Sequence, residues 1–322
     1  MTVVNKATDN MQSIKSITEK VRAGNLDALE IIEDTRQVIS ETDGGIRAWQ
    51  TLDWDEVDRQ VEVLVSNSNW RSLPLAAVPI AVKDVYDTDN FVTTYGSSIY
   101  SSHRPSRDAK LVSILRSLGA IVVGKTVTTE FAYWQPGPTV NPHNKKHTPG
   151  GSSSGSAAAV SSGMIPIALG SQTAASVIRP ASYCGVYGFK PSYGILPLDG
   201  VKPLAPSLDH AGFLARSLED IKIFFTAILG HEHFSQRPLK LRGKTASELA
   251  VTTLSGAWEM VLQRDCQQAV ADCFAGAKSR GSKFSEEVVF SDFERLTRDQ
   301  TTLMAAISRI SCVSGRYWTS AE

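Results

Sequence analysis

The chain has 322 residues, of which 33 are basic (Lys and Arg) and 33 acidic (Asp and Glu), so its formal net charge at neutral pH is zero. This balance lacks the basic excess of nucleic-acid-binding proteins, and we expect no nucleic-acid partner. With 42% hydrophobic and 20% charged residues, the composition is that of a folded globular protein and excludes a disordered or fibrous chain.

Two features of the sequence concern where the protein works. No apolar run approaches the roughly 18 residues that a membrane-spanning helix needs, and residues 1–15 contain no apolar stretch of the signal-peptide kind. We therefore expect a cytoplasmic protein with no membrane partner. The four cysteines form no C-x-x-C pair and are predicted to be buried free thiols. They are Cys184, Cys266, Cys273 and Cys312.

The first part of the chain is predicted to be helical. From residue 13 to about 65, apolar residues such as Ile14, Ile17 and Val21 recur at three- and four-residue steps, the period of an amphipathic helix. Residues 1–65 are therefore interpreted as a helical N-terminal segment. We expect residues 66–322 to form an α/β part that belongs to the same structural domain.

Alternating strands and helices follow. Residues 75–82 form a nearly continuous apolar run, as expected of a strand covered on both faces, and the run ends at Lys83. Residues 106–118 predict a helix that is closed by Gly119 and leads into a strand over residues 120–123. This order of elements is typical of an α/β fold.

Residues 149–163 are rich in glycine and serine, a composition that flexible linkers share. A packed role is indicated instead, because the segment continues into a small-residue helix around residues 157–160 and a buried strand over residues 165–169. The Gly/Ser block is therefore expected to lie inside the folded unit.

Two short motifs match known patterns in the wrong context. Residues 119–126 fit the phosphate-loop pattern G-x-x-x-x-G-K-[ST], but the four variable positions are the predicted strand, and a β-branched run cannot wrap its amides around a phosphate. Residues 151–155 fit the nucleophile-elbow pattern G-x-S-x-G, but no strand precedes them. Nucleotide binding and an α/β-hydrolase elbow are therefore disfavoured.

Lys83 and two serine-rich loops are the candidate catalytic groups. A lysine at the end of an apolar strand either extends its amine to the surface or holds it in a low-dielectric site, where its pKa falls towards that of a base. Residues 150–156 and 170–176 place hydroxyl-rich loops at the ends of neighbouring elements. Such loops favour nucleophilic catalysis, in which a base activates a serine hydroxyl.

The sequence resembles the amidase signature family of serine hydrolases, and the agreement extends over roughly residues 70–225. Four motifs carry the resemblance: PIAVKD around Lys83, PGGSSSGSAAAV from Pro149, GSQTAASVIRPASYCGVYGFKPSYG from Gly170, and SLDHAGFLARSLED from Ser207. The resemblance implies an α/β fold with a mixed central β-sheet sandwiched between α-helices.

Carried over position by position, the resemblance implies a Ser-Ser-Lys triad. Ser176 is then the nucleophile that forms an acyl-enzyme, Ser152 the bridging serine after a cis peptide bond, and Lys83 the base. Neutral Lys83 takes the proton of Ser176 through Ser152, which returns it to the leaving amine. Neither a cofactor nor a metal is implied. The backbone amides expected to bind the oxyanion are those of Thr173, Ala174 and Ala175.

The nucleophile loop departs from the family's pattern. The family commonly has D-x-G-G-S at this place, whereas Gln172 replaces the acid, and Ala174 and Ala175 replace both glycines. If either glycine needs a positive φ, alanine costs about 1 kcal/mol and tilts an oxyanion donor. An arginine that usually lies two residues after the nucleophile lies three after it, at Arg179, which leaves its partner open.

The chain is shorter than most members of the family, and we interpret it as shortened at its C-terminus. Its final predicted helix then carries an apolar stripe that lacks its usual cover. We expect this stripe to be buried in a homodimer or by a rearranged end. The stripe consists of Leu303, Ala306, Ile307 and Ile310.

Histidine-based chemistry is the rival interpretation. His210 lies beside Asp209, but adjacent residues of a strand face opposite ways, so a Ser-His-Asp triad is disfavoured. Residues 231–233 (His-Glu-His) resemble a metal-binding pair, but they follow a glycine and are better explained as a surface turn.

The sequence therefore predicts an amidase that hydrolyses a carbon–nitrogen amide bond in a small, non-peptide, small-molecule substrate. Two alternatives stay open. One is a catalytically inactive, shortened relative that serves as an interaction subunit. The other is the amide-hydrolysing component of a complex that passes ammonia onward.

Overall fold

The computed structural model describes residues 12–235, 248, 250–255, 263–288, 295–296 and 298–305. The chain divides into two compact units, Met1–Arg237 and Pro238–Glu322, and each is described by itself. The predicted division into a helical segment (residues 1–65) and an α/β part (residues 66–322) stays a prediction.

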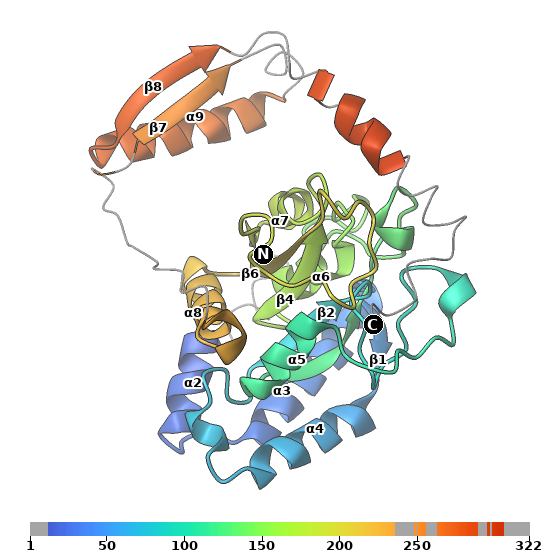
Figure 1. Ribbon diagram of the computed structural model, residues 1–322. Coiled ribbons are helices and arrows are strands. Elements are labelled where there is room, and N and C mark those ends of the chain that lie inside the picture. Colours follow the sequence, from blue (N-terminus) through green and yellow to red (C-terminus); the bar gives the residue numbers. More distant parts are fainter. Residues whose placement is uncertain are drawn as a thin grey trace. The chain divides into compact units, whose positions relative to one another are not determined.

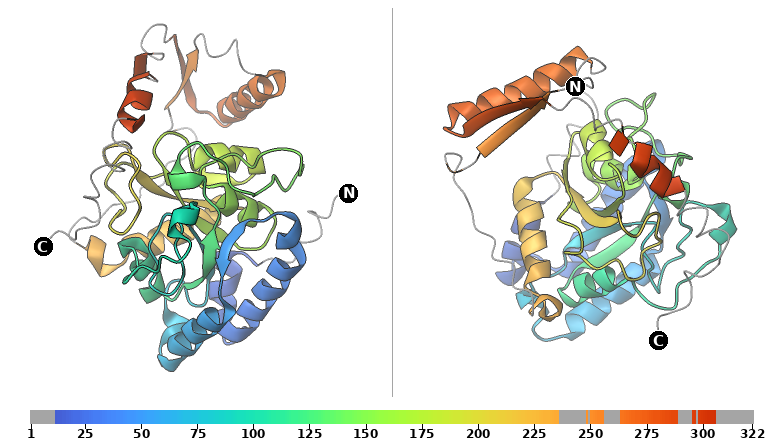
Figure 2. Two further views of the ribbon diagram at one scale, coloured as in Figure 1. Left: turned by 90° about the vertical axis from the view of Figure 1, so that its right-hand side faces the viewer. Right: turned by 45° about the horizontal axis from the view of Figure 1, so that its top comes forward.

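Three helices near the start of the described part of the first unit are capped by side chains at their N-terminal ends. Ser13, Asp27 and Asp53 each accept a hydrogen bond from a backbone N–H at the start of a helix. These helices lie together on one side of the unit (blue in Figures 1 and 2), and the Ile14 N–H donates to Asp220 Oδ1 at 2.8 Å. The helices are α2 (Ile14–Arg22), α3 (Ala28–Thr42) and α4 (Trp54–Ser66).

A six-stranded mixed sheet forms the centre of the first unit, as predicted. The strand order is β1-β3-β2-β4-β6-β5; β2 runs parallel to β3 and β4, and the three other pairs are antiparallel. Strand β1 lies inside the stretch that the sequence predicted as helical, which is therefore interrupted. The strands are β1 (Trp49–Leu52), β2 (Pro79–Lys83), β3 (Ile121–Thr126), β4 (Ile167–Gln172), β5 (Tyr187–Phe189) and β6 (His210–Ala215).

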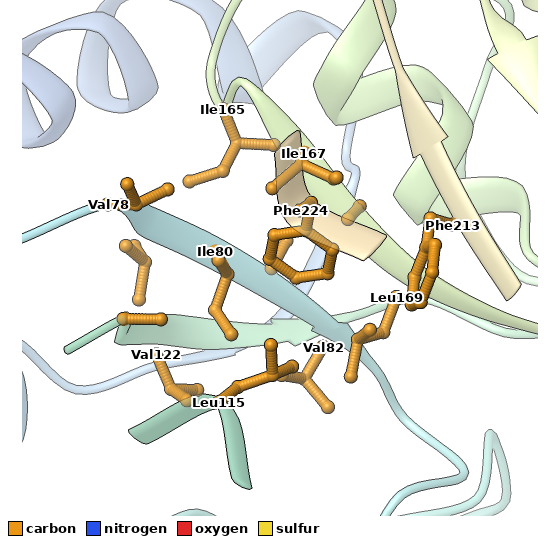
Figure 3. Packing of buried hydrophobic residues seen from close by; sticks show 14 of the residues in the cluster. Val78, Ile80, Val82, Leu115, Val122, Ile165, Ile167, Leu169, Phe213 and Phe224 are labelled. Atoms are coloured by element: carbon orange, nitrogen blue, oxygen red, sulfur yellow. The ribbon is translucent and has the colours of Figure 1, made fainter. Parts of the chain in front are cut away.

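Helices cover both faces of this sheet. Right-handed crossovers place α5 and α6 on opposite faces, because the chain moves from β2 to β3 through α5 and back across β2 to β4 through α6. Figure 3 shows Leu115 of α5 and Phe224 of α8 packed against Ile80 and Val82 of β2. The other α-helices among the described residues of the unit are α5 (Lys110–Ser117), α6 (Ser154–Ser161), α7 (Ile178–Cys184) and α8 (Leu218–Leu229).

Helix α6 is the predicted small-residue helix, and all eight of its residues are buried. Its small side chains let it approach the sheet closely. A Cβ added at Gly155 would collide with the Ala48 carbonyl oxygen and lie 2.5 Å from the Val127 nitrogen. The Gly/Ser block is therefore packed inside the fold and is not a linker.

The second unit contains a parallel pair of strands with a helix between them in sequence: β7 (Ala250–Ser255), α9 (Arg264–Ser279) and β8 (Lys283–Val288). Cys266 and Cys273 are exposed on α9, so the prediction that they are buried was wrong, whereas Cys184 in the first unit is buried. No residue of helix α9 is buried.

Residues 298–305 are helical, and Leu303 is 47% exposed. The other three residues of the predicted apolar stripe, and Cys312, lie outside the described residues. In the part of the chain that the structure covers, no helix is both long and apolar enough to cross a membrane.

Candidate active site

The candidate site lies at the carboxyl ends of the parallel strands. Lys83 ends β2, and the registers place it beside Thr126 at the end of β3 and close to Ser171 near the end of β4. Open α/β sheets bind ligands at this edge, because the loops that follow parallel strands meet there. The fold therefore brings together the lysine and one of the two predicted serine loops.

The Lys83 amine contacts hydroxyl groups from both serine loops. Its Nζ lies 2.7 Å from Ser152 Oγ, 2.9 Å from Ser171 Oγ and 3.5 Å from the Ser171 carbonyl oxygen. The side chain is fully buried, on the opposite face of β2 from Val82. Of the two interpretations left open by the sequence, the amine held in a low-dielectric site is the one that the structure supports.

Burial lowers the pKa of Lys83 from 10.5 to about 7, and the carboxylate of Asp209 partly opposes this shift. In the described part of the chain, no carboxylate lies within ion-pair distance of the Lys83 amine. An amine without a paired carboxylate loses its proton more easily when it is desolvated. Lys83 therefore has a substantial neutral fraction at physiological pH.

The loop that carries Ser152 is fixed by backbone contacts. The Gly151–Ser152 peptide bond is cis, as the resemblance implied. The Thr129 N–H donates to the Ser152 carbonyl at 3.2 Å, and the Arg179 Nε donates to the Gly151 carbonyl at 2.9 Å. The partner of the displaced arginine is therefore the carbonyl oxygen of the cis peptide.

Ser176 lies in the neighbouring loop and is buried. Its carbonyl oxygen accepts a hydrogen bond from the Ser153 N–H at 3.2 Å, which ties the two serine loops together. Among the residues that the structure describes, however, no hydrogen bond joins the hydroxyls of Ser152 and Ser176. Of the two contacts that the predicted triad requires, the described residues show the one between Lys83 and Ser152 and not the one between Ser152 and Ser176.

Gln172 has a structural role that the sequence did not indicate. Its Oε1 accepts the N–H of Val177 at 2.9 Å and the N–H of Ile178 at 3.1 Å, at the start of α7. These two bonds fix the turn that holds Ser176. A neutral amide oxygen thus supplies an acceptor where the family's pattern has a carboxylate.

The two alanines of the nucleophile loop fit their backbone. Neither Ala174 nor Ala175 is among the positive-φ residues of the described chain, so the cost expected for replacing glycine does not arise. Their N–H groups donate to no protein acceptor within the described residues. Thr173, the third predicted residue of the oxyanion hole, donates from its hydroxyl to Asp209 Oδ1 at 2.5 Å.

Asp209 and His210 do not form a catalytic pair. Asp209 Oδ2 accepts the N–H groups of Leu204 and Ala205, whereas His210 Nδ1 lies 2.7 Å from the Leu208 carbonyl oxygen. Asp209 therefore fixes the loop before β6. No group of three or more His, Cys, Asp or Glu that could hold a metal ion occurs in the described residues, which include residues 231–233.

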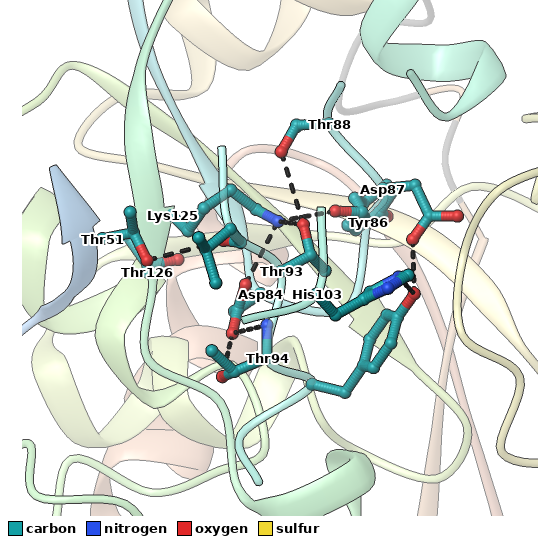
Figure 4. A network of polar contacts seen from close by, with 12 residues as sticks. Thr51, Asp84, Tyr86, Asp87, Thr88, Thr93, Thr94, His103, Lys125 and Thr126 are labelled. Atoms are coloured by element: carbon teal, nitrogen blue, oxygen red, sulfur yellow. Dashed lines mark hydrogen bonds and ion pairs between the residues drawn. The ribbon is translucent and has the colours of Figure 1, made fainter. Parts of the chain in front are cut away.

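A second buried lysine lies on the neighbouring strand (Figure 4). Lys125 Nζ is 3.1 Å from Asp84 Oδ1 and donates to the Tyr86 carbonyl and to Thr93 Oγ1. Burial lowers the pKa of Lys125, and Asp84 opposes the shift. From the sequence, Lys125 was noted only as part of the phosphate-loop pattern at residues 119–126, most of which forms strand β3. Of the two adjacent buried lysines, Lys125 has a carboxylate partner and Lys83 has hydroxyl partners.

A cavity of about 320 Å³ adjoins the loop of the cis peptide. Three aromatic side chains and one charged side chain, that of Arg179, contribute to its wall. Its lining residues are Thr129, Tyr133, Trp134, Pro136, Gly137, Thr139, Thr148, Pro149, Gly150, Gly151, Ser154, Arg179 and Tyr183.

Comparisons with known proteins support the resemblance. The family model Amidase matches residues 30–317. The glutamyl-tRNA(Gln) amidotransferase subunit of Exiguobacterium sibiricum is 38% identical over 227 residues, which are 68% of this chain and 46% of that protein. The AtzE subunit of 1-carboxybiuret hydrolase from Pseudomonas sp. (strain ADP) is 37% identical over 223 residues, 66% of this chain and 49% of that protein.

Solved structures are similar over a larger part of the chain. The native peptide amidase from Stenotrophomonas maltophilia superposes with a TM-score of 0.80 and 25% identity, covering 92% of this chain and 66% of that one. The chain spans about half the length of the curated relatives it matches.

Proposed function

Because this chain belongs to the amidase family, whose enzymes hydrolyse carbon–nitrogen bonds, we propose that it hydrolyses an amide bond of a small non-peptide substrate through an acyl-enzyme on Ser176. The observation that carries the proposal is the fully buried Lys83 amine 2.7 Å from Ser152 Oγ. A desolvated amine beside a serine hydroxyl is the arrangement that general-base activation requires.

The proposed reaction begins with two proton transfers. The neutral amine of Lys83 takes the proton of Ser152, while Ser152 Oγ takes the proton of Ser176. The Ser176 oxygen attacks the amide carbon, forming a carbon–oxygen bond and a tetrahedral oxyanion. The ammonium of Lys83 then returns the proton through Ser152 to the leaving nitrogen, the carbon–nitrogen bond breaks, and an ester on Ser176 remains. Water hydrolyses this ester by the same steps.

The oxyanion is proposed to bind the backbone amides of residues 173–176. The N–H groups of Ala174 and Ala175 support this role because they donate to no protein acceptor in the described residues. One such donor is worth about 3 kcal/mol of transition-state stabilisation. Gln172 contributes indirectly, since its two hydrogen bonds hold the turn that carries these donors.

The proposal requires a hydrogen bond from Ser176 to Ser152 that forms in the substrate complex. Catalytic hydrogen bonds are often long or poorly aligned without substrate and tighten when the substrate binds. The backbone bond from Ser153 N–H to the Ser176 carbonyl already holds the loops side by side. We propose that a movement of the Ser176 side chain towards Ser152 completes the proton path.

The cavity beside Gly151 supports a small substrate. Its volume of about 320 Å³ is at the lower end of the range that small-molecule sites occupy. Its aromatic wall suits the carbon part of an amide, and Gly150 and Gly151, which directly precede Ser152, form part of that wall.

A fluorophosphonate, which reacts with activated serines, tests the proposal directly. We expect one covalent adduct per chain, located on Ser176 by peptide mass spectrometry and lost in the Ser176→Ala and Lys83→Ala variants. Ser162→Ala is a matched control, because Ser162 is a buried serine whose hydroxyl has no hydrogen-bond partner in the described residues. A panel of small aliphatic, aromatic and urea-like amides, with Ser176→Ala as the blank, then identifies the substrate class.

A folded protein that takes up no label contradicts the enzyme proposal. It favours instead the inactive interaction subunit.

A second function is supported by the names of the relatives. Several relatives are amidotransferase subunits, such as that of Exiguobacterium sibiricum, and another is a hydrolase subunit. The same Ser176 chemistry could therefore release ammonia for use by another chain in a complex. Co-purification of the tagged protein from its own cells, followed by mass spectrometry, separates the two functions: a stoichiometric partner favours the complex.

A further inference from the structure

We propose that Ser171 is a positioning residue that turns the lone pair of the Lys83 amine towards Ser152. The inference rests on the proposed function and adds a third serine to the described site. Neither the family's triad nor the sequence motifs assign a role to this side chain.

The polar surroundings of the Lys83 amine are simple. Its side chain is fully buried, and within the described chain the three polar atoms that contact it come from two residues: Ser152 Oγ, Ser171 Oγ and the Ser171 carbonyl oxygen. Ser171 thus presents two atoms to the amine and Ser152 presents one. The carbonyl of Ser171 also accepts from Ser153 Oγ at 3.3 Å, which fixes it in place.

The valence of the amine makes these contacts unequal. A neutral amine has two N–H donors and one lone pair, and it acts as a base only towards the atom that the lone pair faces. The Ser171 carbonyl can only accept, so it takes one N–H. The second N–H goes either to Ser171 Oγ or to Ser152 Oγ.

Only the first of these arrangements leaves the lone pair facing Ser152, and general-base activation of Ser152 requires that orientation. The hydroxyl of Ser171 therefore accepts the second N–H and prevents Ser152 from accepting it. Without that hydroxyl, the amine can donate to Ser152 and lose its ability to take the Ser152 proton.

Ser171→Ala tests this role, because it removes the hydroxyl and leaves the carbonyl in place. We expect the plateau of kcat/KM to fall about tenfold and its acid limb to move to lower pH by about one unit, since the ammonium loses a hydrogen-bond acceptor. Ser171→Thr restores the acceptor and should return both quantities towards the wild type. Ser162→Ala serves as the matched serine deletion.

The other titratable groups around this part of the sheet stay unchanged in these variants. They are Asp209 before β6, the Lys125–Asp84 pair across β3 and β2, and Tyr86 in the loop after β2. If the acid limb of the kcat/KM profile lies at a different pH in Ser171→Ala than in the wild type, the cause is therefore a change in the pKa of Lys83. A general loss of folded protein lowers the plateau and leaves the limb where it is.

A spectroscopic titration keeps the inference independent of turnover. In protein labelled with 13C- and 15N-lysine, the Lys83 signal is assigned as the one absent from Lys83→Met and followed against pH. We expect its midpoint to fall in Ser171→Ala and to recover in Ser171→Thr. A Lys83 midpoint that is the same in Ser171→Ala and the wild type overturns the role of Ser171. The role is also overturned if the wild type takes up the fluorophosphonate and Ser171→Ala has the same kcat/KM plateau as the wild type. A wild type that takes up no label overturns the proposed function instead, and the titration still decides on Ser171.

Discussion

Replacing Lys83 by methionine should make the protein inactive and change how its stability depends on pH. Methionine has a similar length and no charge, so it fits the buried site without the desolvation cost of an ammonium. The shift of the Lys83 pKa from 10.5 to about 7 corresponds to about 5 kcal/mol of unfavourable free energy when the protonated amine is buried. The variant is relieved of this cost but loses two short hydrogen bonds, to Ser152 and Ser171, worth about 1–3 kcal/mol each.

The pH dependence of this difference is the sharper quantity. Because the folded state holds the Lys83 proton less tightly than the unfolded chain does, the unfolded chain binds more protons between about pH 7 and 10.5. The stability of the wild type therefore rises with pH across this window relative to the variant. Between pH 7 and pH 9 the unfolding free energy of the variant should fall by about 2 kcal/mol relative to that of the wild type, whatever the absolute difference.

Urea unfolding followed by tryptophan fluorescence measures this change, since Trp49 and Trp70 are buried in the first unit. Wild type and Lys83→Met are compared at pH 7, 8 and 9 in the same buffer series. All other ionisable groups are shared, so the difference between the two proteins isolates Lys83. A difference that stays constant over this range refutes the neutral-amine interpretation, because it means that the native amine does not lose its proton near pH 7.

Three further predictions concern activity and packing. The kcat/KM of the wild type should fall as pH drops below about 7, to about a tenth of its plateau at pH 6, because Lys83 must be neutral to act as a base; a flat profile from pH 6 to 8 contradicts this. Gln172→Ala should lower kcat/KM by about tenfold, because it leaves two N–H groups at the start of α7 without an acceptor. Gln172→Glu keeps an acceptor oxygen and should retain more activity. Equal losses of kcat/KM in the two variants argue against this role of the Gln172 side chain. Gly155→Ala should lower the unfolding free energy by about 3 kcal/mol or more, because the added Cβ collides with the Ala48 carbonyl oxygen. Chemical denaturation measures this loss. Gly44→Ala is the control, because a Cβ added at Gly44 meets nothing within 4 Å.

The central part of the fold was predictable because its signals are local. The apolar runs that became β2, β3 and β4 are buried on both faces, and such strands are visible in sequence without knowledge of their neighbours. The helix predicted over residues 106–118 begins at Lys110, after the cap Ala109. Boundaries of this kind depend on tertiary contacts of the first turn, which the local pattern does not contain.

Strand β1 was missed because its stability comes from distant residues. Its four residues alternate over too short a stretch to be told from a helix, and they become a strand by pairing with β3, which lies about 70 positions later. The role of Gln172 was also missed, because it depends on the direction in which one side-chain oxygen points, which the sequence pattern does not contain. The pairing of Lys125 with Asp84 could have been suspected, because most buried lysines are paired with a carboxylate.

The triad residues were predicted by resemblance, and their arrangement depends on register. Lys83 and Ser171 meet because β2 and β4 are adjacent and parallel, a fact of topology that neither motif contains. Ser171 itself was part of a quoted motif without a separate role. Counting acceptors around a buried amine requires coordinates, and the sequence alone could not have singled it out.

Strand β1 also sets a limit on how far the protein can be trimmed from its N-terminal side. It closes the β3 edge of the sheet, and the hydrogen bond from the Ile14 N–H to Asp220 joins α2 to α8. A fragment starting at residue 66 would leave a bare row of backbone donors and acceptors on β3, which other polypeptides could join by strand addition. Shorter versions made for crystallisation or engineering should therefore keep everything from α2 onward.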